Sequence, residues 1–332
     1  MTLTQLRYFA AIVDAGLSIT IAARHMHGTQ SGLSKQIKQL EDELGFVLFT
    51  RRARSLTALT PAGQQVLEHV RPLLAHAHSI RTLGANLRKE TNGELRIATT
   101  HTQAQHFLPT TLARLKKRFP EVAVHLAPGG DADSLRQLAR GEVDLAIVST
   151  GGQAPGADIA LPLYRWDRVI VVPARHRLTR LGRAITLQDL ALEPLVSYES
   201  SRDRTSSLRT AFAQVGVEPT ITMTARDADL IKTYVRAGHG VGIVAEMVVD
   251  GPDPDLAVIP ADGLFPTCTT WLLLRREPVL REFTFAFIGD LLPQVHVADL
   301  RRLLGEQEGA DQRIEAPHWR DRPIRRGFAR RA

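Results

Sequence analysis

Apolar residues near the N-terminus recur every three or four positions, which is the period of an amphipathic helix. The pattern predicts helices over residues 3–13, 18–26 and 29–44, with His27-Gly28 ending the second helix and Thr29 capping the third. Two short helices joined by a tight turn, with small alanines where they cross, are typical of a helix-turn-helix. In that motif the second helix lies in the DNA major groove, with its N-terminal residues against base edges.

Polar and basic side chains fill the exposed face of the third predicted helix. Glutamine can pair with adenine through two hydrogen bonds, and lysine can reach guanine or phosphate. Residues 48–60 then combine apolar positions that would pack inward with arginines that would face phosphates, as in a wing. The predicted DNA-contacting residues are Thr29, Gln30, Ser31, Ser34, Lys35, Lys38, Arg51, Arg52 and Arg54. A helical hairpin without a nucleic-acid role is the alternative.

A long helix is predicted after the wing, with Thr60 as its N-cap and Pro61 in its first turn. Its apolar residues step by three and four, which is the spacing of a seam between paired helices. Pro72 lies inside the helix and removes a backbone hydrogen bond, so we expect a kink that costs about 3 kcal/mol unless other contacts compensate. The seam comprises Val66, Val70, Leu73, Ala77 and Ile80, continued by Leu83 and Leu87.

Beyond this helix short apolar runs alternate with helical patterns, which predicts an α/β fold of parallel sheets with helices on both faces. Two α/β subdomains fit the pattern: residues 94–162 with a return segment over 267–305, and residues 165–265. The chain would cross between them near 163–165 and 266–269, which would form a hinge. In such folds the ligand binds beyond the carboxyl ends of the strands.

Five polar residues in a row, from Thr99 to Gln103, stand where the first of these strands gives way to a helix. We expect Thr102 to cap the helix that runs from Gln103 to Phe119. Hydroxyls, an amide and free backbone N–H groups at the positive end of a helix dipole form a site for a small anion. Ordinary capping beside a polar loop is the alternative.

Composition narrows the class of protein. The 332 residues suggest more than one domain, and the single cysteine, Cys268, excludes an internal disulfide framework. The N-terminus lacks the features of a signal peptide, and no apolar run approaches the roughly 18 residues of a membrane span, so we expect a soluble cytoplasmic protein. The net charge is +7, and its basic excess lies in residues 1–90 and 313–332, which suggests a polyanionic partner. Solvated surface charge is the alternative.

The sequence contains none of the motifs of zinc, nucleophile-elbow or phosphate-loop chemistry, so we expect no catalysis, no metal and no cofactor. The last residues, 311–332, are rich in arginine and proline and are predicted to be a basic, disordered tail.

The segment AARHMHGTQSGLSKQIKQLEDELGFVLFTR, followed by LTPAG, resembles the N-terminal domain of LysR-type transcriptional regulators. The segments ATTHTQA, YRWDR and TARDADLIKTYVRAGHGVGIVAEM are similar to the CysB/Cbl-like branch of that family, whose members regulate sulfur assimilation. The resemblance implies a winged helix-turn-helix domain over 1–60, a linker and dimerisation helix over 61–90, and an effector-binding domain of periplasmic-binding-protein type over 91–310.

The resemblance also implies an effector such as sulfate, N-acetylserine or O-acetylserine. The implied effector-binding residues are Thr100, Thr102, Gln103, Ser149, Trp166, Asp203 and Thr205. Asp203 stands where the branch has a threonine, and its carboxylate would repel an anion. Either Arg202 or Arg204 neutralises it, or Thr205 supplies the hydroxyl, or the ligand carries an amine.

The implied partners are promoter DNA, RNA polymerase and further copies of the chain, as a dimer and tetramer. Two alternatives remain open: a LysR-type regulator of unrelated metabolism with a different effector, and a cytosolic solute-binding sensor without DNA binding.

Overall fold

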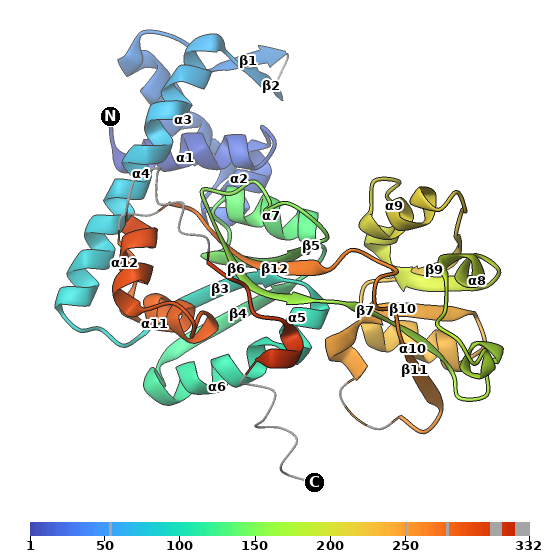
Figure 1. The fold of residues 1–332 in the computed structure, drawn as a ribbon. Helices are drawn as coiled ribbons and strands as arrows, with labels where there is room; N and C mark the ends of the chain where they lie inside the picture. Colours follow the sequence, from blue (N-terminus) through green and yellow to red (C-terminus); the bar gives the residue numbers. More distant parts are fainter. Residues whose placement is uncertain (53–54, 250, 252, 277–278, 306–313, 323–332) are drawn as a thin grey trace. The chain divides into compact units, whose positions relative to one another are not determined.

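The computed structural model describes residues 1–52, 55–249, 251, 253–276, 279–305 and 314–322 (Figure 1). The chain divides into two compact units, Met1–Glu90 with Glu277–Arg281, and Thr91–Arg276 with Glu282–Ala332. Among the described residues, no helix is both long enough and apolar enough to cross a membrane.

The first unit begins with three helices and a hairpin. Their bounds are α1 (Leu3–Asp14), α2 (Ile19–His25), α3 (Gln30–Leu44), β1 (Phe49–Arg52) and β2 (Ser55–Leu59). The helices and the antiparallel hairpin share one apolar core that contains Phe9, Leu33 and Phe49. His27 turns the chain with a φ of 50°, and the hydroxyl of Thr29 caps α3. The winged helix-turn-helix predicted from the sequence is confirmed.

Two contacts fix the wing, the β1–β2 hairpin, against the helices. The carboxylate of Glu41 is buried and accepts hydrogen bonds from the N–H groups of Leu48 at 2.8 Å and Phe49 at 3.4 Å. Gly63 lies directly against the backbone of Leu48, and a Cβ at position 63 would overlap the Leu48 carbonyl oxygen. Glycine is therefore required where the linker helix leaves the wing.

The linker helix is α4 (Pro61–Leu87), which Thr60 caps by accepting a hydrogen bond from the Gly63 N–H at 2.9 Å. It continues through Pro72 without a break, so the expected kink there stays a prediction about its curvature. The predicted seam divides in two, because Val70 is buried in the core of the helix-turn-helix whereas Ile80 is exposed. Only the second half of the seam is therefore open for pairing with another helix.

The second unit contains two α/β subdomains. Subdomain I comprises β3 (Gly93–Thr99), α5 (His101–His106), α6 (Leu108–Arg118), β4 (Val122–Pro128), α7 (Asp131–Ala139), β5 (Leu145–Thr150), β6 (Ile159–Trp166), β12 (Cys268–Leu274), α11 (Glu282–Leu291) and α12 (Val297–Gly305). Its strands lie in the order β4-β3-β5-β12-β6, and α6 and α7 cover opposite faces of the sheet (Figure 1). The connection from β3 leads outward to β4, and the connection from β4 leads back past β3 to β5. Because both crossovers are right-handed, their helices must lie on opposite faces of the sheet.

Subdomain II comprises β7 (Arg168–Pro173), η1 (Arg177–Arg180), α8 (Leu187–Ala191), β8 (Pro194–Tyr198), η2 (Glu199–Arg202), α9 (Ser207–Gln214), β9 (Thr220–Ala225), α10 (Ala228–Arg236), β10 (Val241–Ala245), η3 (Glu246–Val249) and β11 (Leu256–Pro260). Its strands lie in the order β11-β7-β10-β8-β9. The hinge between the subdomains consists of Asp167, which separates β6 from β7, and residues 261–267, which separate β11 from β12.

Both sheets are mixed, so the prediction of parallel sheets is wrong for part of each. β12 runs antiparallel to β5 and β6, and β7 runs antiparallel to β10 and β11. The strands next to the hinge enter each sheet from the other subdomain, so they need not follow a local strand–helix–strand crossover. The helix predicted from Gln103 to Phe119 is also divided, because α5 ends at His106 and α6 begins at Leu108.

The prediction of a disordered tail is wrong for residues 314–322. This segment includes the short helix η4 (Trp319–Asp321), and the side chains of Ala316, Trp319 and Arg322 are buried. The segment is ordered because its aromatic and aliphatic groups find apolar partners on subdomain I. The other tail residues, 311–313 and 323–332, lie outside the described part of the chain.

Candidate functional site

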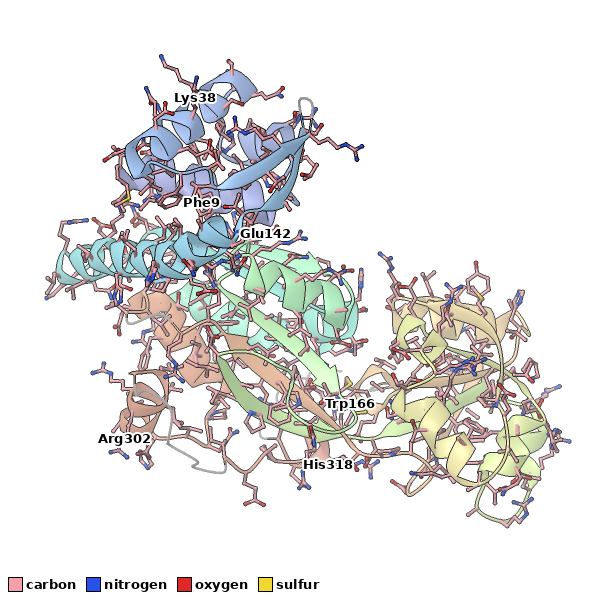
Figure 2. All side chains as sticks on the ribbon, turned by 90° about the horizontal axis from the view of Figure 1, so that it is seen from above. Phe9, Lys38, Glu142, Trp166, Arg302 and His318 are labelled. Atoms are coloured by element: carbon pink, nitrogen blue, oxygen red, sulfur yellow. The ribbon has the colours of Figure 1, made fainter. Side chains whose placement is uncertain are left out.

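The candidate DNA-binding surface lies at the start of α3. Thr29, Gln30, Ser31, Lys35 and Lys38 are exposed there, and Ser34 is half-buried. Figure 2 shows Lys38 projecting outward from α3, whereas Phe9 points into the core. The buried positions Leu33 and Ile37 fix which face of α3 remains available to DNA.

The three predicted arginines of the wing differ in their surroundings. Arg51 donates to the buried carboxylate of Glu41 at 2.6 Å, so it stabilises the wing as well as contributing charge. Arg52 is exposed. Arg54 lies outside the described residues.

The candidate effector site lies where the carboxyl ends of β3 and β5 meet. The connections that follow β3 and β4 run in opposite directions, so the strand order reverses between β3 and β5, which is the usual ligand position in such folds. The residue that caps α5 there is Thr100, whose hydroxyl accepts the N–H of Gln103 at 3.4 Å. The prediction that Thr102 is the cap is wrong, because the helix begins earlier, at His101, and places Thr102 within its first turn.

Three of the predicted effector residues converge on a buried hydroxyl, that of Thr270 in β12. The Nε2 of Gln103 lies 3.4 Å from Ser149 Oγ and 3.5 Å from Thr270 Oγ1. The hydroxyls of Ser149 and Thr270 are 2.9 Å apart, and the indole Nε1 of Trp166 donates to Thr270 at 3.1 Å. The structure thus assembles Gln103, Ser149, Trp166 and Thr270 into one network, which we call the polar cluster.

Tyr164 fixes the orientation of this cluster. Its hydroxyl donates to the Oε1 of Gln103, and burial raises the pKa of Tyr164 well above its ordinary value, so the phenol stays protonated. With its oxygen engaged, the Gln103 amide must present its NH₂ group to Ser149 and Thr270.

Thr102 faces subdomain II. Burial raises the pKa of Tyr198, and hydrogen bonds to the Ala245 N–H and the Thr102 hydroxyl oppose this rise. Nearby, Gln105 donates to Asp229 at 2.7 Å, so α5 contacts elements of both subdomains.

Arg168 places a positive charge beside the hinge. It donates to Ser207 Oγ at 2.8 Å, and its guanidinium lies 5.9 Å from the centre of the Trp166 ring. Ser207 also lies against Gly151 of subdomain I, where a Cβ would overlap the Ser207 hydroxyl. Arg168 is therefore next to both the polar cluster and the point where the subdomains meet.

Asp131 adds a carboxyl group at the edge of the cluster. Its Oδ1 accepts a hydrogen bond from the Ser149 N–H at 3.0 Å. Burial raises the pKa of Asp131 to about 6, against the lowering effect of that hydrogen bond. The group therefore titrates at a higher pH than an ordinary aspartate.

Two predicted effector residues bond to each other and not to the polar cluster. The Oδ1 of Asp203 accepts hydrogen bonds from the N–H of Thr205 at 2.9 Å and from its hydroxyl at 2.8 Å. Both residues are exposed, and these bonds lower the pKa of Asp203. Neither side chain forms a described hydrogen bond with Gln103 or Trp166.

Sequence reasoning missed Thr270, Tyr164 and Arg168. Tyr164 and Arg168 are the first and last residues of the YRWDR segment, so that segment carried a signal that was read only at Trp166. Thr270 gave little signal, because a threonine at the start of an apolar strand is commonplace.

Within the described residues, one group of side chains has metal-ligand character. Asp167, Glu246 and His318 each offer an atom within 4.8 Å of the others. His318 Nε2 lies 3.0 Å from Asp167 Oδ2, and Arg320 Nε donates to Glu246 Oε2 at 2.6 Å. These side chains already neutralise one another as an ion-pair network, and a divalent cation would have to displace Arg320 from Glu246.

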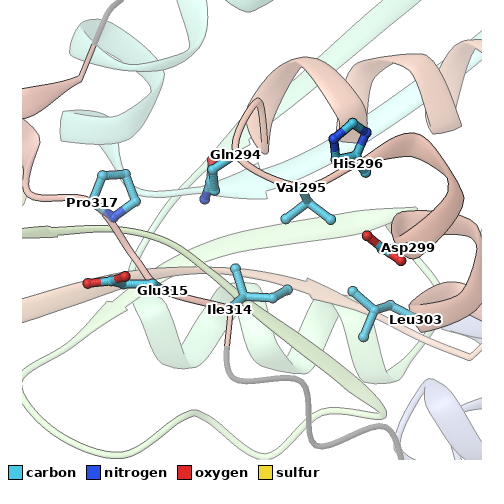
Figure 3. Close-up of a pocket in the computed structure, with 8 residues that line it drawn as sticks. All are labelled: Gln294, Val295, His296, Asp299, Leu303, Ile314, Glu315 and Pro317. Atoms are coloured by element: carbon cyan, nitrogen blue, oxygen red, sulfur yellow. The ribbon is translucent and has the colours of Figure 1, made fainter.

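A separate pocket of about 650 Å³ lies beside the end of α11 and the C-terminal segment (Figure 3). It is lined by Gln294, Val295, His296, Asp299, Leu303, Ile314, Glu315 and Pro317. None of the predicted effector residues lines it. Residues 306–313, which connect α12 to Ile314, lie outside the described part of the chain. Because the pocket contains none of the predicted effector residues, the polar cluster remains the candidate effector site.

Comparison with known proteins identifies two domains in the chain. The family model "Bacterial regulatory helix-turn-helix protein, lysR family" matches residues 3–64, and "LysR substrate binding domain" matches residues 88–295. The transcriptional regulator CysB of Haemophilus influenzae is 37% identical over 295 residues, which is 89% of this chain and 91% of that protein. The regulator SsuR of Burkholderia cenocepacia is 35% identical, over 92% of this chain and 99% of its own.

The crystal structure of the cofactor-binding domain of the Cbl transcriptional regulator is also similar. It aligns with a TM-score of 0.59 and 33% identity, over 66% of this chain and 96% of that chain. These relatives are transcriptional regulators, in agreement with the prediction that the chain is not an enzyme. The protein belongs to the LysR family of DNA-binding transcriptional regulators, with an N-terminal helix-turn-helix domain and a C-terminal effector-binding domain.

Proposed function

We propose that this LysR-type regulator senses a small anionic or zwitterionic metabolite of sulfur or cysteine assimilation. The observation that carries the proposal is the polar cluster, in which the Gln103 NH₂ group, the Ser149 hydroxyl and the Trp166 N–H converge at the ends of parallel strands. Converging neutral donors bind an anion without a lysine, as backbone and amide groups do in other anion sites. The similarity to CysB and SsuR supports a sulfur compound as the effector.

Two neighbouring charges define the effector class further. Arg168, beside Trp166, favours an anionic group. Asp131, beside Ser149, favours an amine when it is ionised. A tetrahedral anion would use the first group, and a zwitterion such as O-acetylserine would use both.

The regulatory cycle follows from this placement. Two chains pair through the exposed half of α4, and dimers associate into a tetramer that presents several α3 helices to promoter DNA in the cytoplasm. Effector binding at the subdomain boundary favours one hinge arrangement, and this changes the spacing of the DNA-binding domains and the recruitment of RNA polymerase. The effector must bind the two arrangements with different affinity, because equal affinity would shift nothing.

The first experiment titrates the full-length protein with sulfate, thiosulfate, O-acetylserine and N-acetylserine and records the melting temperature. We expect a saturable rise of about 2–4 °C with one of them. Thr102→Ala should raise the effector concentration needed for half of that rise by roughly tenfold or more, because the proposed effector lies between the subdomains and the variant loses the hydroxyl that faces subdomain II there. Thr210→Ala, an exposed threonine on α9, serves as the control and should respond like the wild type.

The second arm measures binding to a mixed-sequence DNA duplex. Lys35→Ala should weaken DNA binding and lower the salt slope, while leaving the anion response unchanged. Thr102→Ala should leave DNA binding unchanged. Loss of DNA binding in Thr102→Ala would contradict the assignment of this residue to the effector site. No salt-dependent DNA affinity in the wild type would favour a sensor without DNA binding, and no response to the four compounds would move the effector outside sulfur metabolism.

A further inference from the structure

The C-terminal segment Ile314–Arg322, which we call the strap, passes along subdomain I and ends beside the hinge. Its first contacts are with the outer edge of the sheet. The N–H of Arg165 in β6 donates to the Pro317 carbonyl at 2.9 Å, and Arg165 Nε donates to the Ala316 carbonyl at 3.1 Å. His318 and Arg165 form a parallel bridge, so the strap pairs with an edge strand that otherwise has a free side.

The strap then buries two side chains against the residue that orients Gln103. The Trp319 ring centre lies 5.1 Å from that of Tyr164. Arg322 is only 3% exposed, and its guanidinium carbon lies 4.8 Å from the Tyr164 ring centre and 4.7 Å from that of Phe107. Burial lowers the pKa of Arg322, and its charge is stabilised by the faces of the two rings. Tyr164 is thus held on one side by the strap while its hydroxyl holds Gln103.

The strap also reaches the hinge and subdomain II. His318 Nε2 lies 3.0 Å from Asp167 Oδ2 and 3.7 Å from Glu246 Oε1. Arg320 pairs with Glu246 at 2.6 Å and with Asp262 at 3.5 Å. Glu246 is the first residue of η3, and Asp262 lies in the second hinge segment. One nine-residue segment, 314–322, therefore contacts β6, the hinge and subdomain II.

We propose that the strap is a positioning element for the effector site. Packing of Trp319 and Arg322 on Tyr164 fixes the Gln103 amide with its NH₂ group toward Ser149 and Thr270. The ion pairs of His318 and Arg320 hold the hinge in the arrangement that brings the subdomains together around this cluster. The proposal rests on the proposed function, in which the polar cluster binds the effector.

Coupling between the two sites is reciprocal. If a docked strap improves effector affinity, a bound effector must stabilise the docked strap by the same factor. Strap docking and effector binding are then two linked equilibria, and their coupling can be measured from either one.

The test uses full-length protein and two readouts. Amide hydrogen exchange without any ligand follows β6 and α5, and sulfate titration follows the melting temperature. Trp319→Ala should speed exchange at Arg165, whose N–H bonds to Pro317, and also across α5, which carries Gln103. The sulfate concentration needed for half of the rise in melting temperature should increase by roughly fivefold or more. Trp319→Phe keeps an aromatic ring against Tyr164 and should restore both readouts.

Arg320→Ala tests the hinge contacts with little risk to folding, because its side chain is 45% exposed. It should weaken the response to sulfate without changing exchange at Arg165. Faster exchange confined to β6 in Trp319→Ala, with α5 and the sulfate response unchanged, would overturn the proposal and leave the strap as a cover for a sheet edge.

The exchange readout separates the two proposals. If the wild type does not respond to sulfate but Trp319→Ala speeds exchange in α5, the strap positions Gln103 and the effector assignment has failed. If α5 exchange does not change in Trp319→Ala, the strap proposal has failed whatever the wild type binds.

Discussion

Among single residues, Asp131 links protonation to folding. Its pKa rises from the ordinary value of an aspartate to about 6 in the folded protein, because burial disfavours the carboxylate. The folded state therefore binds a proton more tightly than the unfolded state, so this group stabilises the protein at low pH and the contribution is lost as pH rises through about 6. Relative to wild type, the free energy of unfolding of Asp131→Asn should increase as pH rises from about 4 to about 6. Above about pH 6 the gain should be constant at roughly 2–3 kcal/mol.

The measurement is the difference in melting temperature between Asp131→Asn and wild type across pH 4 to 8, since other titrating groups largely cancel in that difference. Asp133→Asn is the matched control, because the Asp133 side chain is on the same helix, is 49% exposed and pairs with Arg136 at the surface. A difference for Asp131→Asn that does not change between pH 4 and 6 would show that burial does not shift this carboxyl group.

Among the elements, α4 carries the exposed apolar face expected of a pairing helix. Ile80 is 72% exposed, and Leu83 and Leu87 are also exposed on the half of the helix that leaves the helix-turn-helix core. Ile80→Asp should place a charge in the centre of the paired seam from both chains. We expect the dimer to weaken by about a hundredfold or more, because each copy loses the burial of an isoleucine side chain and gains a desolvated charge.

Sedimentation analysis of the full-length protein over a range of concentrations would measure this effect. Leu192→Asp is the control, because Leu192 is 75% exposed and lies outside α4. The monomer released by Ile80→Asp should keep the melting temperature of its effector domain. Unchanged association in Ile80→Asp would show that the chains pair through another surface.

The same elements show what the sequence could predict. The helix-turn-helix, its caps and α4 follow from local periodicity and from polar residues next to each helix, and these were predicted. The antiparallel pairing of β12 with β5 and β6 was not, because its partners lie far away in the sequence and their pairing depends on tertiary structure. The cap of α5 was misplaced because several neighbouring threonines offer the same chemistry, and only the backbone selects Thr100.

The ordered strap illustrates the same limit. Its composition, rich in arginine and proline, is typical of disorder. Trp319 and Arg322 nevertheless pack on Tyr164, a residue far upstream, and no property of the tail alone reveals this partner. In the candidate effector site, Gln103, Ser149 and Trp166 were expected from the family resemblance, whereas their hydrogen bonds to Thr270 could be seen only in the folded sheet.

Considered as a whole, the molecule carries a net charge of +7, but only charges near the DNA contribute to binding. In the wing, Arg52 is exposed, whereas Arg51 pairs with the buried Glu41 at 2.6 Å. Arg52→Ala should therefore lower the salt slope of DNA binding by roughly 1–2, counting one phosphate contact from each chain of a dimer. Its melting temperature should change little.

Arg51→Ala should instead have the larger effect on stability and the smaller effect on the salt slope of DNA binding. Glu41 would keep its hydrogen bonds from Leu48 and Phe49 but lose its only described ion pair, so we expect the wing to lose stability on the order of 1 kcal/mol. The lost charge should lower the salt slope less than Arg52→Ala does, because Glu41 already neutralises part of it. Binding to a mixed-sequence duplex at several salt concentrations, together with melting temperatures, separates the two variants. Equal salt slopes would mean that Arg51 leaves Glu41 when DNA is bound, and that the wing rearranges on the duplex.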